Sequence, residues 1–80
     1  MTVHLNLYST TNCHLCEEVE TLLNSLNHQY NFISTNIEIT EDITLLALYE
    51  LKIPVLKRID NNQEIFWPFS IDEIKKLLIQ

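Results

Sequence analysis

The hydrophobic pattern along the chain switches between strand-like and helix-like periods. Apolar residues at every second position predict a strand over residues 3–8, and a second strand is predicted over residues 30–37. Helical spacing predicts a helix over residues 15–26, whose apolar stripe is Leu15, Val19, Leu22, Leu23 and Leu26. A further helix is predicted over residues 40–51. Its expected buried face is Ile43, Leu46 and Ala47.

The C-terminal third reads as a hairpin followed by a helix. Strands are predicted over residues 55–59 and 64–67, joined by a turn in which Asn61 and Asn62 can adopt positive φ angles. The chain contains no glycine, so left-handed turn positions must fall to Asn or Asp. Ser70 and Glu73 have the spacing of a capping box in front of the last helix. The apolar stripe of that helix is Ile71, Ile74, Leu77 and Leu78.

The order of these elements predicts the fold class. A strand, a helix and a strand in succession imply a right-handed crossover between parallel strands. The whole order, βαβ-α-ββ-α, indicates an α/β domain with a mixed four-stranded sheet and helices on both faces. With 80 residues, we expect one domain over residues 1–80.

Charge is distributed unevenly along the chain. The net charge is −6, all five basic residues lie at or beyond position 52, and residues 1–51 carry seven acids. An acidic domain of this kind is not expected to bind nucleic acid. The sequence lacks a recognisable secretory signal and any run of about 20 apolar residues, so we expect a cytoplasmic monomer with no membrane partner.

Both cysteines lie where the first strand turns into the first helix. Cys13 and Cys16 are three positions apart, which places their sulfurs on one face of a first helical turn that Thr11 or Asn12 could cap. The free N–H groups and the positive end of the helix dipole favour a thiolate there. The thiolate is the form that attacks a disulfide, so this pattern favours a redox-active dithiol.

Other interpretations of the cysteine pair remain open. A structural disulfide would close a very short loop and stabilise the fold by only about 2 kcal/mol. A metal site, including one shared between two chains, is a further alternative, although zinc takes four ligands and His4 and His28 are isolated in the sequence. A c-type haem would need a histidine where Glu17 stands. The two cysteines could also be unrelated buried residues. In a reducing cytosol a cysteine pair is more often catalytic than structural.

Several segments together resemble the thioredoxin superfamily in its minimal glutaredoxin form. The resemblance covers nearly the whole chain and is closest to short bacterial glutaredoxin-like proteins. The segments that carry it are Tyr8-Ser9, Cys13-His14-Leu15-Cys16, Ile53-Pro54-Val55 and Trp67-Pro68-Phe69. It implies that Cys13 is the attacking nucleophile and Cys16 the resolving thiol. It also implies that Pro54 is a cis-proline facing the cysteines, and that the backbone groups of Ile53 face a substrate strand.

Neighbouring side chains should tune the reactive sulfur. We expect Cys13 to be the more acidic and more exposed thiol, because it lies at the helix start. Glu17, one turn further on, disfavours a negatively charged sulfur, and a protonated His14 would favour it. These opposing effects are similar in size, so we expect Cys13 to be only moderately more reactive than an ordinary thiol.

The sequence departs from the glutaredoxin pattern where glutaredoxins hold glutathione. Thr10 stands where a basic residue is usual, and the Gly-Gly turn is replaced by Trp67-Pro68-Phe69-Ser70. We therefore expect glutathione to bind poorly. Trp67 and Phe69 either pack in the core or border a groove for a protein substrate.

The predicted function is a thiol–disulfide oxidoreductase acting on protein disulfides. No cofactor or metal is expected, and the reductant that recycles the protein is a thioredoxin-type reductase or glutathione. The alternatives are a glutathione-dependent glutaredoxin and a non-catalytic thioredoxin-like binding module.

Overall fold

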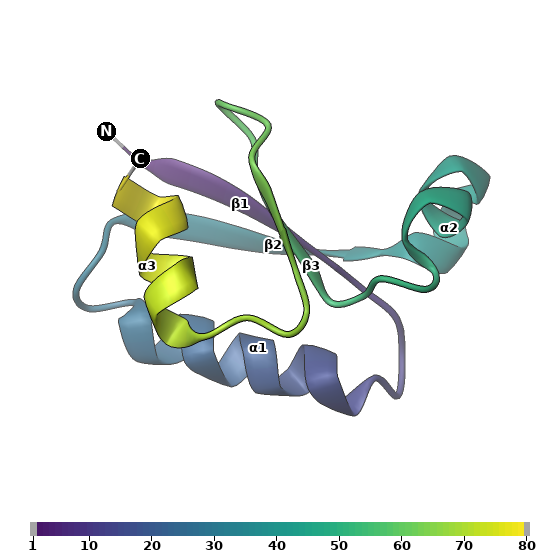
Figure 1. The fold of residues 1–80 in the computed structure, drawn as a ribbon, viewed down its shortest axis with the longest axis horizontal. Helices are drawn as coiled ribbons and strands as arrows, with labels where there is room; N and C mark the ends of the chain where they lie inside the picture. Colours follow the sequence, from purple (N-terminus) through teal and green to yellow (C-terminus); the bar gives the residue numbers. More distant parts are fainter. Residues whose placement is uncertain (1, 80) are drawn as a thin grey trace.

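A mixed four-stranded sheet forms the centre of the computed structural model, which describes residues 2–79 (Figure 1). Its strands are β1 (Val3–Ser9), β2 (Phe32–Glu38), β3 (Val55–Arg58) and β4 (Glu64–Phe66). The spatial order is β2-β1-β3-β4, with β1 and β2 parallel and the other pairs antiparallel. The predicted α/β fold class and its mixed sheet are confirmed.

Two helices cover one face of the sheet and form the main core with it. These are α1 (His14–Leu26) and α3 (Ile71–Ile79), which lie on the same side of the strands in Figure 1. Alternation along β1 points Leu5 and Leu7 at these helices. The other buried members of this core are Val19, Leu23, Leu26, Phe32, Leu56, Phe69, Ile74, Leu77 and Leu78.

The opposite face of the sheet is covered only at one end. There a short 3-10 turn, η1 (Ile39–Glu41), leads into α2 (Ile43–Tyr49). Tyr49 stacks on Tyr8 of β1, with ring centroids 4.5 Å apart. Together with Ile39 and Val55 these tyrosines form a second, smaller core. Helices therefore lie on both faces, but α2 covers much less of the sheet than α1 and α3 do.

The expected buried face of the second helix was wrong. Ile43 is 85% exposed, Ala47 is exposed, and Leu46 is only half-buried. The helix begins three residues later than predicted, because an Asp42 Oδ1 atom accepts hydrogen bonds from the backbone nitrogens of Thr44 and Leu45, at 2.8 and 3.3 Å. Its buried side chain is Tyr49, which packs against Tyr8 and Ile39.

Asparagine replaces glycine at the left-handed turn positions, as expected. Asn12 and Asn62 have φ angles of 60° and 59°, whereas Asn61, the other candidate in the hairpin turn, does not have a positive φ. In the hairpin turn, Oδ1 of Asn61 accepts a hydrogen bond from the backbone nitrogen of Gln63 at 3.0 Å. The predicted Ser70 cap is also present, since its hydroxyl oxygen accepts from the backbone nitrogen of Glu73 at 3.3 Å.

One buried charge joins the sheet to the last helix. Arg58 on β3 donates to the backbone oxygens of Leu77 and Leu78, at 2.9 and 3.2 Å, where α3 ends. The same guanidinium makes a two-pronged contact with Asp60, at 2.7 and 3.1 Å. Its hydrogen bonds also hold the pKa of Asp60 below its usual range. Within residues 2–79, no helix is long and apolar enough to cross a membrane.

Candidate active site

The cysteine pair lies where the loop after β1 leads into α1. β1 ends at Ser9, and the left-handed Asn12 turns the chain into the helix. The residue that caps α1 is Cys13, not Thr11 or Asn12 as predicted, because the Cys13 sulfur itself accepts the backbone N–H of Cys16 at 3.2 Å. Sulfur thus takes the capping role that an oxygen usually fills.

Cys13 and Cys16 are joined by a disulfide, with their Cα atoms 5.2 Å apart. Cys13 is half-buried, whereas Cys16 is only 3% exposed. The expectation that Cys13 is the more exposed of the two is confirmed. Cys16 occupies the buried position that the periodicity assigned to Leu15, which is 40% exposed. Cys13 is therefore the cysteine of the pair that is more accessible from solvent.

The helix start places one backbone donor, the N–H of Cys16, at the Cys13 sulfur. In addition to the Cys16 N–H, the first turn contributes the positive end of the dipole of a 13-residue helix. These groups stabilise negative charge on a sulfur at this position. The resemblance implies the same position for the attacking sulfur.

The two residues expected to tune the sulfur lie in solvent on the first turn of α1. His14 Nδ1 and Glu17 Oε2 are 3.8 Å apart, with side chains 85% and 68% exposed. A pair this exposed is screened by water, so its effect on Cys13 is small. No cluster of three or more His, Cys, Asp or Glu side chains that could hold a metal ion occurs in residues 2–79.

Pro54 lies at the same end of the sheet as the cysteines. The Ile53–Pro54 peptide bond is cis, as the resemblance implied. The next residue, Val55, pairs with Tyr8 of the strand that leads to Cys13. The backbone nitrogen of Ile53 donates to the oxygen of Tyr49 at 3.1 Å, so a substrate strand could use only the Ile53 carbonyl oxygen. The Pro54 oxygen accepts the backbone N–H of Trp67 at 3.2 Å.

The two aromatic residues beyond the hairpin pack against each other. Phe69 is 6% exposed and belongs to the main core, and Trp67 packs against that core while remaining half-buried. Their ring centroids are 5.4 Å apart in an edge-to-face arrangement. The burial of Phe69 agrees with the core-packing alternative. Part of the Trp67 side chain remains exposed to solvent. The Trp67–Pro68 bond is a second cis peptide, which the sequence reading did not anticipate.

A cavity of about 360 Å³ opens beside the disulfide, between the loop after β1, the start of α1 and the end of β2. Both cysteines line it, together with three carboxylates: Glu17, Glu20 and Glu38. We call this cavity the disulfide groove. The sequence reading missed Glu20 and Glu38. Helical spacing from Cys13 could have found Glu20, and the parallel pairing of β1 with β2 could have found Glu38, which lies opposite Ser9.

Glu38 is the most firmly held of the three carboxylates. Its Oε1 accepts the backbone N–H of Thr11 at 2.9 Å, and its Oε2 accepts from the backbone nitrogen and the hydroxyl of Thr40 at 3.1 and 2.9 Å. Hydrogen bonds from the backbone N–H of Thr40 and the hydroxyl of Thr10 lower the pKa of Glu38 most, and the Thr40 hydroxyl and Thr11 N–H add to this. The groove thus keeps a fixed negative charge beside the disulfide.

Structures of bacterial proteins resemble this fold over almost their whole length. A solution structure of protein Ne2328 from Nitrosomonas europaea has 30% sequence identity and a TM-score of 0.84, with 95% of this chain and 91% of that chain covered. A crystal structure of the structural-genomics target XcR50 from X. campestris has 28% identity and a TM-score of 0.79, with coverages of 92% and 93%. None of the curated proteins matches the chain.

A thioredoxin shares the fold at lower sequence identity. A mutant thioredoxin from Halobacterium salinarum has 21% identity and a TM-score of 0.74, covering 95% of this chain and 71% of that chain. This similarity confirms the thioredoxin-like fold. Residues 4–79 match the family described as "Glutaredoxin-like domain (DUF836)". With nearly the whole length matched, and with two cysteines paired at the start of α1, the chain belongs to this glutaredoxin-like family.

Proposed function

We propose that this protein is a thiol–disulfide oxidoreductase that acts on protein disulfides through Cys13 and Cys16. The observation that carries the proposal is the asymmetry of the pair: Cys13 is accessible at the start of α1, and Cys16 is buried one turn behind it. An attacking thiol must reach its partner, whereas a resolving thiol needs to reach only the first sulfur. A purely structural disulfide would not require this asymmetry.

The proposed reaction has two exchange steps. The thiolate of Cys13 attacks one sulfur of the partner disulfide, which forms a mixed disulfide and releases one partner thiolate that takes up a proton. Cys16 then loses its proton and attacks the Cys13 sulfur, which forms the Cys13–Cys16 disulfide and releases the second partner thiolate. Two electrons pass to the partner. A reductant, either a thioredoxin-type reductase or glutathione, must return them.

Residues around the pair would bind the partner. The carbonyl oxygen of Ile53, beside Pro54, can accept a hydrogen bond from an extended partner chain. The exposed part of Trp67 offers an apolar contact. The exposed charges of His14 and Glu17 would change the reactivity of the Cys13 thiolate only slightly, because water screens them.

A turnover assay with a small disulfide and dithiothreitol tests the proposal. We expect wild-type protein to accelerate reduction of the disulfide and Cys13→Ser to abolish the acceleration. A wild-type rate equal to that of dithiothreitol alone would instead favour the non-catalytic binding module. A comparison of glutathione with a thioredoxin-type reductase as the recycling reductant then identifies the electron donor.

A further inference from the structure

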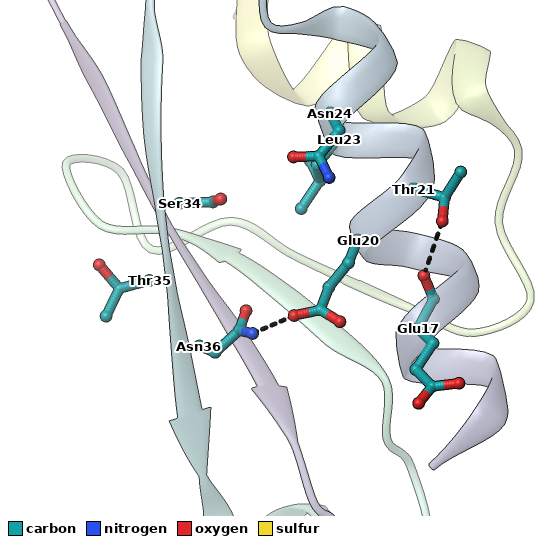
Figure 2. Close-up of a pocket in the computed structure, with 8 residues that line it drawn as sticks. All are labelled: Glu17, Glu20, Thr21, Leu23, Asn24, Ser34, Thr35 and Asn36. Carbon is teal, nitrogen blue, oxygen red and sulfur yellow. Dashed lines mark hydrogen bonds between the residues drawn. The ribbon is translucent and has the colours of Figure 1, made fainter. Parts of the chain in front are cut away.

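Cys13 and two of the groove carboxylates lie along one stripe of α1. Glu17 follows Cys13 by four residues and Glu20 by seven, a spacing that keeps all three on the same side of a helix. This stripe faces β2. Figure 2 shows the Glu20 side chain reaching from α1 to the amide nitrogen of Asn36 on β2, to which it is hydrogen-bonded. The Glu20 carboxylate is thereby held between the helix and the edge strand.

The disulfide groove continues along this stripe into a larger depression. A cavity of about 690 Å³ lies between α1 and β2 and shares Glu17, Glu20 and Asn36 with the disulfide groove. The rest of its lining is mainly polar, including Asn24 and Ser34 (Figure 2). A chain bound at Cys13 could therefore continue along a polar path that begins at the disulfide.

The negative charge of the groove is not balanced by nearby cations. Glu20 is hydrogen-bonded to a neutral amide, and Glu38 to neutral threonine groups. The two ion pairs found in residues 2–79 are the exposed His14–Glu17 pair and the Arg58–Asp60 pair on β3. No Lys or Arg side chain within this range lines either cavity.

None of the basic residues within residues 2–79 lines the disulfide groove. Lys52, two residues before Pro54, has its ammonium over the ring of Phe66, 5.4 Å from the centroid, and Lys57 on β3 pairs with Asn6 of β1. Lys75 and Lys76 are on α3, which packs near the end of α1 that is remote from Cys13 (Figure 1). The charged side chains that line the cavity beside the disulfide are therefore all carboxylates.

We infer that the partner of the Cys13–Cys16 pair is a polypeptide whose disulfide is flanked by Lys or Arg residues. The inference rests on the proposed function and names the substrate class of that same site. Side chains next to a disulfide bonded to Cys13 would fall within the roughly 8–10 Å over which charges interact at physiological salt. The three carboxylates that line the disulfide groove would then attract a basic chain and repel an acidic one.

Matched peptides test this selectivity. Three short peptides share one sequence and one internal disulfide, and differ only in the two flanking residues, which are both Lys, both Gln or both Glu. Reduced wild-type protein, freed of reductant, is mixed with each peptide, and thiol release is followed in a single turnover. We expect the Lys peptide to react about tenfold faster than the Glu peptide at about 20 mM salt, with the Gln peptide between them. The difference should shrink severalfold at about 500 mM salt.

Two variants identify the residues responsible. Glu20→Gln keeps an oxygen that can accept from Asn36 and removes the charge, and Glu17→Gln/Glu20→Gln removes two charges. The readout is the ratio of the Lys-peptide rate to the Glu-peptide rate, because a general change in Cys13 reactivity cancels in this ratio. We expect the ratio to fall about threefold in Glu20→Gln and further in the double variant. Glu18→Gln, on the same helix but outside both cavities, should keep the wild-type ratio.

The possible outcomes separate the two proposals. Equal rates for the three peptides, or a faster Glu peptide, would overturn the basic-substrate inference while leaving the oxidoreductase intact. A Lys preference that survives in the double variant would also overturn the assignment to this groove. Absence of thiol release from all three peptides would overturn the oxidoreductase and the inference together.

Discussion

The sulfur of Cys13 lies 3.2 Å from the backbone nitrogen of Cys16 and accepts its N–H. One residue is thus both the cap of α1 and the accessible half of the disulfide. The groups that begin the helix are the same groups that would stabilise a thiolate after reduction. The two cysteines should therefore differ strongly in reactivity.

Single-cysteine variants should show this difference. We expect reduced Cys16→Ser, which retains Cys13, to be alkylated by iodoacetamide about tenfold faster at mildly acidic pH than Cys13→Ser, which retains the buried Cys16. The rate of alkylation is measured against pH for both variants. Faster low-pH reaction of the variant that keeps Cys16 would reverse the assigned roles.

Glutathione should bind weakly. It carries net negative charge, and the disulfide groove presents Glu17, Glu20 and Glu38 to it. Residues 1–51 contain no Lys or Arg, and the residues that line the groove include none. We expect no saturation of Trp67 fluorescence or of amide NMR shifts when glutathione is titrated through the micromolar range. Saturation in that range, with efficient glutathione-driven turnover, would support a glutathione-dependent glutaredoxin instead.

We expect Phe69 to stabilise the fold and to take no part in substrate binding. It is 6% exposed within the main core, and truncation of a buried phenylalanine to alanine typically costs about 3–5 kcal/mol. The milder Phe69→Leu should lower the free energy of unfolding by about 1–2 kcal/mol in a denaturant titration, with an unchanged single-turnover rate. Unchanged stability combined with a raised KM would place Phe69 at the substrate.

Glu38 should make the fold sensitive to acid. Its hydrogen bonds to Thr40, Thr10 and Thr11 lower its pKa in the folded state. The contribution of the Glu38 carboxylate to the free energy of unfolding is therefore complete above the unfolded-state pKa of about 4.3. It is lost as pH falls through the lower folded-state pKa. We expect Glu38→Gln to melt at a lower temperature than wild type at pH 7, with the difference shrinking below about pH 4.

A neighbouring acid provides the control for this measurement. Glu41 is exposed on the 3-10 turn that Glu38 caps. Glu41→Gln should therefore melt close to wild type across the same pH range. A constant difference between Glu38→Gln and wild type down to pH 2 would contradict the proposed role of the carboxylate.

Local chemistry made much of the fold predictable from the sequence. The spacing of Cys13 and Cys16, the apolar alternation of β1 and the Ser70 cap each depend on residues close together in the chain. Asn62 could be assigned to a left-handed position because the chain has no glycine to take it. The cis form of Pro54 came from the family resemblance, since a single proline does not specify its isomer.

Longer-range contacts account for the parts that could not be predicted. The face of α2 is set by the Asp42 cap and by the stacking of Tyr49 on Tyr8, two residues far apart in the chain. The disulfide groove likewise needs Glu38, which a parallel strand brings beside Ser9. Helical periodicity alone could not distinguish Leu15 from Cys16 as the buried residue, because both are apolar and both lie at helical spacing from the buried Val19.

Trapping the mixed disulfide tests the central claim most directly. Reduced Cys16→Ser retains the accessible Cys13 but lacks the resolving thiol, so it should stop after the first exchange. Mass spectrometry after mixing with a disulfide peptide should show one peptide thiol attached at Cys13, whereas Cys13→Ser should remain largely unmodified. Wild-type protein should instead release both peptide thiols and return to its internal disulfide. No adduct on Cys16→Ser, or equal adduct formation on both variants, would contradict the proposed dithiol mechanism.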